Sequence, residues 1–329
     1  MPKQLSIVIP TYNRRERLGR VLRALSEQTV DLSSFEAVVV DDGSKDGTSE
    51  WLKEQSFGFE VQVLSQTNRG PAEARNAGID AAQGELVLFL DDDVVPEPQL
   101  IEEHLKSHAA EADVVVMGPL VSLDHYEQPW VAWEQEKLER QYQAMTRKEW
   151  EPTYRQFWTG NASIARAHLL AAGKFDPTFK RGEDVELGLR LHERGLKFRF
   201  NGRARGLHHA ERSLDSWEHA HRSYGRLEAE MLSSRPNDEV VSILSGNWRR
   251  LNPLTRAAAR LCIQSPALNQ GATRLLREAL KTEPMRRSSF VSSKACSLLA
   301  NILYWRESAA VLGPDRLKRV FRQARKSTS

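Results

Sequence analysis

The stretch from Leu86 to Asp93 constrains the fold of this chain more than any other. It begins with five consecutive apolar residues, Leu-Val-Leu-Phe-Leu, a pattern typical of a strand that is buried on both faces of a parallel sheet. The run ends in three carboxylates, Asp91, Asp92 and Asp93. Because ligands of open α/β sheets bind at the carboxyl ends of the strands, the sequence predicts a site at this point.

The three acids favour a bound cation. Side chains alternate along an extended chain, so we expect Asp91 and Asp93 to face one way and Asp92 the other. Neighbouring carboxylates repel each other unless a cation lies between them, and hard oxygen ligands suit Mg²⁺ or Mn²⁺, often shared with substrate phosphates. A solvated acidic loop or the start of a helix is the alternative interpretation.

Strand and helix patterns alternate over the first 118 residues. This alternation predicts an α/β fold with a doubly wound, mostly parallel sheet and right-handed crossovers. The predicted strands are residues 5–10, 35–40, 61–64, 86–90 and 113–118. Asn13 is a plausible N-cap for the first helix. The strand that ends at Val40 also runs into acids, so we expect Asp42 at the same sheet edge as Asp91 and Asp93. No G-x-G-x-x-G follows the first strand, which disfavours a dinucleotide-binding fold.

Charge divides the chain of 329 residues, whose net charge is +3. Residues 249–329 hold 17 Lys and Arg against four acids, a balance of +13 that leaves −10 for the remainder. We therefore expect two functional parts, residues 1–235 and a helical extension of residues 236–329. The two cysteines suit a reducing cytosol, and we expect neither a signal peptide nor an apolar run of the roughly 18 residues that span a bilayer.

The segment after residue 120 is rich in aromatic residues, Trp158 among them. Core packing explains most of these rings, and the others could line a partly wet pocket. A polar strand follows near Asn161, and Glu183 with Asp184 opens a later helix. His208 and His209 follow a short strand. A histidine in this position is more often structural than ligating, but nearby acids would raise the odds of a ligand.

Taken together, these segments resemble the family 2 glycosyltransferases of GT-A fold over roughly residues 3 to 230. Each matching segment is modestly specific alone, and their shared order makes the match strong. They are Pro10-Thr11-Tyr12-Asn13, Val40-Asp41-Asp42-Gly43-Ser44-Lys45-Asp46-Gly47-Thr48, Ala74-Arg75-Asn76-Ala77-Gly78, Phe89-Leu90-Asp91-Asp92-Asp93, Gly160-Asn161-Ala162-Ser163, Gly182-Glu183-Asp184-Val185-Glu186-Leu187 and His208.

The resemblance implies a donor site and a metal site. Thr11 and Asp42 would hold the nucleobase and ribose of a UDP-, GDP- or dTDP-linked sugar. Asp91-x-Asp93 would be the DXD metal motif for Mg²⁺ or Mn²⁺, with Asp93 the more direct ligand. His208 would be a further ligand, with His209 as a less favoured substitute. The other implied donor-side residues are Pro10, Tyr12, Arg69, Arg75 and Asp92, of which the two arginines would contact phosphate or fix the loop.

The resemblance also implies an inverting reaction. Asp184 would deprotonate the acceptor hydroxyl, and Asn161, Glu183 and Trp158 would lie on the acceptor side. One base without an enzyme nucleophile implies a single displacement with inversion at the anomeric carbon. Like charge raises the pKa of one member of a neighbouring carboxylate pair. If Asp184 is to accept a proton, it should be the member that stays deprotonated. The chain lacks the Q-x-x-R-W signature of processive relatives, which favours transfer of one sugar.

The expected product is a bacterial-type polysaccharide, glycolipid or cell-surface glycan, made from a glycan or lipid-linked acceptor. Two other interpretations remain open at this point. One is a haloacid-dehalogenase-like phosphotransferase with Asp91 as nucleophile. The other is a non-catalytic module that binds membranes or nucleic acid, although we expect no nucleic acid as a partner of the enzyme.

The basic extension predicts peripheral binding to the inner face of an anionic membrane. Its last helix carries apolar residues on one face, Leu317, Val320, Phe321 and Ala324, and basic residues on the other. A second apolar patch is formed by Leu298, Leu299, Ile302, Leu303 and Trp305. A helical cap with a solvated basic face is the alternative interpretation.

Overall fold

The computed structural model describes residues 3–122, 126–179, 181–208, 210, 212–233 and 237–326. The chain forms two compact units: unit 1 holds residues 1–124 and 138–210, and unit 2 holds residues 125–137 and 211–329. The boundary therefore lies near residue 210 and not at the expected 235. The reason is helix α8 (Leu214–Ser233), which packs along the last helix of the chain.

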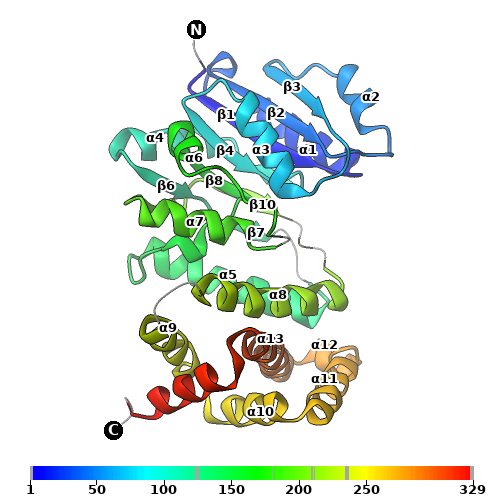
Figure 1. Cartoon of the computed structure of the whole chain (residues 1–329). Helices are drawn as coiled ribbons and strands as arrows, with labels where there is room; N and C mark the ends of the chain where they lie inside the picture. The colour runs from blue at the N-terminus through cyan, green and yellow to red at the C-terminus, as the bar shows by residue number, and fades with distance from the viewer. Residues whose placement is uncertain are drawn as a thin grey trace. The chain divides into compact units, whose positions relative to one another are not determined.

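Unit 1 is built on a mixed sheet whose described strands follow the order β3-β2-β1-β4-β8-β6-β9 (Figure 1). The neighbours β3, β2, β1 and β4 run parallel, and β6 runs parallel to β9. Only β8 is antiparallel to both of its neighbours, which confirms the mostly parallel sheet. The strands are β1 (Leu5–Thr11), β2 (Phe35–Asp41), β3 (Glu60–Ser65), β4 (Leu86–Leu90), β6 (Val114–Met117), β8 (Asn161–Ala165) and β9 (Lys197–Phe200).

Helices cover both faces of this sheet, as the unbroken apolar strands predict. One face packs against α3 (Pro71–Ala81), α6 (Arg166–Ala171) and α7 (Glu183–Glu193). The other packs against α1 (Arg15–Leu25), α2 (Thr48–Lys53) and α4 (Leu100–Ala110). Short 3-10 turns are η1 (Leu32–Ser34) and η2 (Tyr154–Gln156). The helix α5 (Pro129–Thr146) gives its first residues to unit 2 and the rest to unit 1.

A small second sheet in unit 1 positions His208. It joins β5 (Val94–Pro96), β10 (Gly206–His208) and β7 (Leu120–Ser122), with β10 in the middle. Strand β10 is antiparallel to β5, and the register pairs His208 with Val94, the residue directly after the acids. Gly206 makes this close approach possible, because a Cβ atom there would lie 2.4 Å from Val94 Cγ1.

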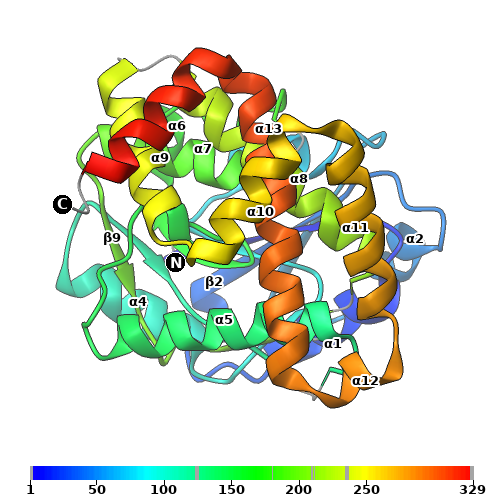
Figure 2. The same ribbon diagram turned by 90° about the horizontal axis from the view of Figure 1, so that it is seen from below.

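Unit 2 is helical in its described residues, and Figure 2 labels its helices α8, α9, α10, α11, α12 and α13. Besides α8, its helices are α9 (Asn237–Arg249), α10 (Pro253–Gln264), α11 (Pro266–Leu280), α12 (Glu283–Arg287) and α13 (Ser289–Lys326). Helix α13 is kinked at Gly313 (φ 74°), which precedes Pro314. Gly225 on α8 lies so close to α13 that a Cβ there would meet the Tyr304 carbonyl oxygen.

The apolar faces of the predicted tail helices are buried inside unit 2. Leu317, Val320, Phe321 and Ala324 are at most 8% exposed, and they belong to one core with Trp248 and Trp305. Leu299, Ile302 and Leu303 of the second patch are buried as well. These apolar faces therefore pack in a helical core and are not free to enter a membrane. Binding of the basic surface to a membrane stays a prediction. Within the described ranges, no helix combines the length and the apolar content of a bilayer crossing.

Candidate active site

The carboxyl ends of β1, β2 and β4 meet at one edge of the sheet. The backbone N–H of Asp42 donates to the Thr11 carbonyl oxygen at 2.9 Å. The Thr11 hydroxyl, which is almost fully buried, donates to Asp92 Oδ2 at 2.8 Å. The three strand ends are thus joined by direct hydrogen bonds, as the parallel sheet predicts.

The three acids lie in a turn and not on an extended strand. The backbone N–H of Val94 donates to the Asp91 carbonyl oxygen at 3.1 Å, so the chain turns immediately after β4. As a result, Asp92 Oδ1 and Asp93 Oδ2 both face Arg14, whose Nη1 lies 2.9 Å from each. The prediction that Asp91 and Asp93 would share one side, with Asp92 opposite, is wrong because strand alternation does not extend through a turn.

Asp92 is the buried anchor of this turn. Its side chain binds Thr11 and Arg14. Burial raises the pKa of Asp92 to about 6, although the Arg14 charge and the hydrogen bonds from Thr11 and Arg14 act in the opposite direction. Through Thr11, Asp92 holds the turn of Asp91, Asp92 and Asp93 (the acid turn) against β1. Only 4% of its surface is exposed, so it offers little surface to a donor.

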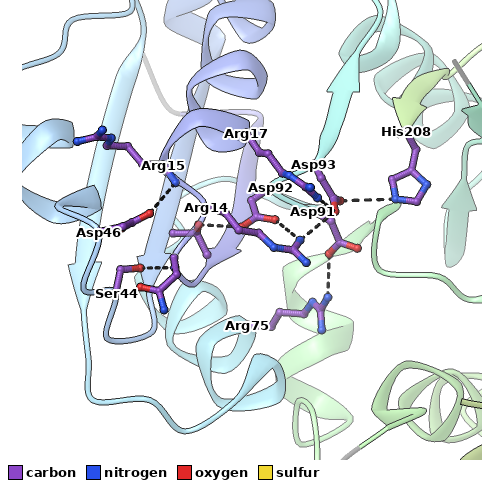
Figure 3. A network of polar contacts seen from close by, with 12 residues as sticks. Arg14, Arg15, Arg17, Ser44, Asp46, Arg75, Asp91, Asp92, Asp93 and His208 are labelled. Carbon is purple, nitrogen blue, oxygen red and sulfur yellow. Dashed lines mark hydrogen bonds and ion pairs between the residues drawn. The ribbon is translucent and has the colours of Figure 1, made fainter. Parts of the chain in front are cut away.

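Asp93 and His208 face each other, with Asp93 Oδ1 and His208 Nε2 3.8 Å apart (Figure 3). A carboxylate oxygen and an imidazole nitrogen at this separation can both reach one divalent cation at about 2.1 Å. In the described part of the chain, no three His, Cys, Asp or Glu side chains form a ready-made cage. The donor set therefore fits a cation whose other ligands are substrate phosphates and water. His209 lies outside the described residues.

Arg75 joins Asp91 to Glu183. Its Nη2 donates to Asp91 Oδ1 at 2.9 Å and its Nη1 to Glu183 Oε1 at 3.0 Å. The side chain is 7% exposed, so it offers little surface to a phosphate. Its two ion pairs agree with the second expectation, that Arg75 fixes nearby structure. Gly160 leaves room for the other carboxylate oxygen of Asp91, because a Cβ atom at Gly160 would lie only 3.0 Å from Asp91 Oδ2.

Asp184 lies at the start of α7, next to the charges of Glu183 and Arg75. Gly182 precedes the helix with φ 73°, a left-handed conformation that glycine adopts without strain. Burial, and then the neighbouring Glu183 charge, raise the pKa of Asp184 to about 7. The expectation that Asp184 would be the fully deprotonated member of the pair is therefore wrong, because Glu183 is the member paired with Arg75.

Asp42 shapes the loop at residues 66–70. Its Oδ1 accepts from Gln66 Nε2 and from the Arg69 backbone N–H, and its Oδ2 accepts from the Gly70 N–H, each at 2.8 Å. The Arg69 side chain is exposed beside this loop, as is Tyr12 after β1, and Pro10 is half-buried. Arg69 and Tyr12 thus keep the surface that donor binding requires, whereas Asp42 is 5% exposed.

Asn161 is a structural residue, contrary to its expected place on the acceptor side. Its side chain is 1% exposed, and its Nδ2 donates to the carbonyl oxygens of Pro119 and Ala204. Its Oδ1 lies 2.9 Å from His104 Nε2. Every polar atom of this amide is thereby used inside the fold. Trp158 remains half-buried, with its ring 5.6 Å from that of Tyr142.

The sequence contained one signal that was not used. Arg14 and Arg17 stand at the beginning of α1, where the helix dipole disfavours positive charge. Arg17 Nη1 lies 3.7 Å from Asp93 Oδ2. Basic residues at a helix N-terminus are stabilised by a nearby carboxylate. In this fold Asp92 and Asp93 provide it.

The sequence of this chain is similar to that of known proteins. A family model described as Glycosyl transferase family 2 matches residues 6–170. The validoxylamine A glucosyltransferase of Streptomyces hygroscopicus subsp. jinggangensis (strain 5008) is 35% identical over 219 residues, which cover 58% of this chain and 52% of that protein. The chain thus spans about half the length of the curated relatives that it matches.

Two solved structures share the fold. TarS 1-349 of S. aureus in complex with UDP-GlcNAc has a TM-score of 0.56 at 18% identity, over 93% of this chain and 91% of that one. The mannosyltransferase PcManGT from Pyrobaculum calidifontis in complex with GDP-Man and Mn2+ has a TM-score of 0.55 at 17% identity, over 100% of this chain and 90% of that one.

Proposed function

Because this chain belongs to glycosyltransferase family 2, we propose that it moves one sugar from a nucleoside-diphosphate sugar to an acceptor hydroxyl, with inversion at the anomeric carbon. The observation that supports this most is the approach of Asp93 to His208 beside Asp91, whose charge also acts on Asp184. The family match over residues 6–170 favours this function over a phosphotransferase or a non-catalytic module.

Asp93 and His208 would hold Mg²⁺ or Mn²⁺, with Asp91 beside them. A divalent cation bound there would act as a Lewis acid that stabilises the negative charge of the departing diphosphate. Arg75 keeps Asp91 in place from the buried side, and it does the same for Glu183 at the head of α7. These ion pairs hold the acids in position before substrate arrives, which is how positioned charge contributes to rate.

Asp184 is the general base of this proposal. The acceptor oxygen forms a bond to the anomeric carbon, its proton passes to the Asp184 carboxylate, and the carbon–oxygen bond to the diphosphate breaks with its electron pair on the leaving group. A pKa of about 7 suits this task, because a base accepts a proton efficiently when its pKa lies near the working pH.

The donor class is supported by the solved structures with similar folds, one in complex with UDP-GlcNAc and the other with GDP-Man. Tyr12 and Arg69 are two exposed residues at this edge that would contact a UDP-, GDP- or dTDP-linked sugar. Thr11 and Asp42 would position the strand ends behind it. The acceptor would be a glycan or a lipid-linked sugar, approaching on the side of Glu183 and Trp158.

The test is a screen of UDP, GDP and dTDP sugars with Mn²⁺ or Mg²⁺, read as thermal stabilisation and as slow hydrolysis of the donor. We expect one nucleotide to raise the unfolding temperature only when the metal is present. Asp93→Ala should remove the metal dependence, and Asp80→Asn, an exposed acid of the same unit, should not. Stabilisation that is equal with and without metal would contradict the metal assignment.

We also propose that unit 2 binds an anionic membrane, which would suit an enzyme with a lipid-linked acceptor. Leu254 and Leu261 on α10 are 83% and 54% exposed, and Leu268 and Leu275 on α11 are 53% and 73% exposed. Each pair is two helical turns apart and shares one helix face. Because residues 249–329 carry +13, a second copy of this surface would be repelled, whereas anionic lipid would be attracted.

Vesicle co-sedimentation of the full chain tests this surface. We expect binding to vesicles that contain anionic phospholipid at low salt, release at high salt, and no binding to neutral vesicles. Leu254→Gln combined with Leu275→Gln should weaken the binding. Leu170→Gln, an exposed leucine of unit 1, is the matched control. Binding that is unchanged in the double variant would show that these leucines do not form the membrane surface.

A further inference from the structure

Each acid of the turn after β4 faces an arginine. The pairs are Asp91 with Arg75, Asp92 with Arg14, and Asp93 with Arg14 and, at a longer distance, Arg17. The positive charge that the acids need is therefore supplied by the chain itself. A cation that enters between Asp93 and His208 must share Asp93 with Arg14.

Arg75 and Arg14 differ in how firmly they are held. Arg75 is 7% exposed and is fixed from a second direction by Glu183, so it stays in place when a ligand binds. The Arg14 side chain is 46% exposed, and among the described side chains its guanidinium hydrogen-bonds to Asp92 and Asp93 alone. Of the two arginines, Arg14 is the one that is able to move.

The backbone that carries Arg14 is fixed. Asn13 has φ 54°, its N–H donates to Ser44 Oγ at 2.9 Å, and its Oδ1 accepts from the Lys45 N–H at 2.7 Å. Asn13 is therefore not the expected N-cap, since it ties the chain to the loop after β2. Arg14 takes the N-cap position of α1. Its backbone is held in place, and its side chain is able to change rotamer.

We propose that Arg14 is a donor-binding residue that pairs with Asp92 and Asp93 before substrate binds and transfers to the donor diphosphate when the cation and the donor bind. This inference rests on the proposed function. A divalent cation at Asp93 weakens the pairing of Arg14 with that carboxylate, because like charges repel. The diphosphate then offers the planar guanidinium two acceptor oxygens, and its negative charge suits the N-terminus of α1.

Substitution of Arg14 has opposite effects on two affinities if this inference is correct. In Arg14→Ala, the affinity for Mn²⁺ alone should rise, by about 2- to 5-fold, because an exposed competing charge pair is removed. The affinity for UDP or GDP at saturating Mn²⁺ should fall by about 10- to 100-fold, because a charged hydrogen bond to phosphate is lost. Titration calorimetry or the Mn²⁺ spin-resonance signal measures both without any catalytic turnover.

Two variants serve as controls, together with a thermal melt of each protein. Arg15→Ala removes the neighbouring arginine, whose side chain points away from the acids in Figure 3, and should change neither affinity. Arg14→Lys keeps the charge without the planar fork and should give intermediate values for both.

The outcomes separate the inference from the proposed function. If Arg14→Ala weakens both affinities, Arg14 only supports the acid turn, and the inference is overturned. It is overturned equally if neither affinity changes. If the wild-type chain binds no Mn²⁺ and no nucleoside diphosphate, the proposed function itself fails.

Discussion

The sheet edge of unit 1 buries charged groups, whereas the helices of unit 2 bury aromatic rings. Asp42, Arg75, Asp92 and Glu183 are each at most 9% exposed at the edge of the sheet. In unit 2 the ring of Trp248 lies 4.8 Å from that of Trp305 and 4.3 Å from that of Phe321. Both regions are well packed, but their side chains contribute to different properties of the protein.

Burying charge is costly unless every charge is paired, and well-packed apolar residues would often be as stable in its place. The paired charges at the sheet edge are therefore better explained by chemistry than by stability. The rings of unit 2 carry no such cost, and their burial stabilises the fold directly. Substitutions at the edge should change rates, and substitutions in the helical core should change the free energy of unfolding.

Asp184→Asn should give the largest effect and test the first half of this comparison. Loss of a general base lowers kcat by roughly 10² to 10⁴. The amide is nearly isosteric, so the unfolding temperature and nucleotide binding should be unchanged. Glu186→Gln, on the same helix but paired with Arg190, is the control and should keep most of the activity. An unimpaired Asp184→Asn enzyme, or a product with retained anomeric configuration, would refute the single displacement.

Trp305→Ala tests the second half. The side chain is 1% exposed, and removing a buried Trp costs about 3–5 kcal/mol of unfolding free energy. Hydrogen exchange of unit 2 and urea unfolding measure this loss, and the rate per folded molecule should not change. Phe290→Ala, at a ring that is 72% exposed, should cost less than about 0.5 kcal/mol. Equal losses in the two variants would mean that Trp305 is not a core residue.

Asn161→Ala tests whether Asn161 stabilises the fold of unit 1 or contributes to acceptor binding. The change leaves His104 and the carbonyls of Pro119 and Ala204 without their partner, and should cost about 1–3 kcal/mol of unfolding free energy. The KM for the acceptor should stay the same. A raised acceptor KM with unchanged stability would return Asn161 to the acceptor side.

The pH dependence of kcat should show the smallest effect. Asp184 must be deprotonated to accept a proton, and its pKa is about 7, so the rate should fall about tenfold for each pH unit below that value. Above pH 7 the rate should level off. The Glu186→Gln control should keep this profile, and Asp184→Asn should lack its acidic limb. If kcat of the wild-type enzyme falls only near pH 4, the pKa of Asp184 is not raised in the working enzyme.

Sequence reasoning predicted the sheet well because unbroken apolar runs such as 86–90 have few other places to fold. It also placed Asp42, Asp91 and Asp93 at one edge, since parallel strands end together. It could not predict the turn at Asp91, because the turn depends on contacts with Thr11 and Arg14 from distant parts of the chain.

The helical extension shows a different limit. The amphipathic face with Leu317 and Val320 fits a membrane surface as well as it fits a core, and only the packing of α13 against α8 decides between them. The leucines that are exposed, such as Leu254 and Leu275, lie on helices whose sequences gave no such expectation.

The three-residue pairing between β5 and β10 limits changes of chain length in the connection that precedes His208. Its register alone sets His208 opposite Val94, next to Asp93. Because side chains alternate along a strand, loss or gain of one residue between Asn201 and Gly206 would bring a neighbour of His208 to that position and turn the imidazole to the other side. Related chains should therefore tolerate many substitutions in this connection but few changes of its length. A single-residue deletion there should remove the proposed metal binding while the rest of the sheet still forms.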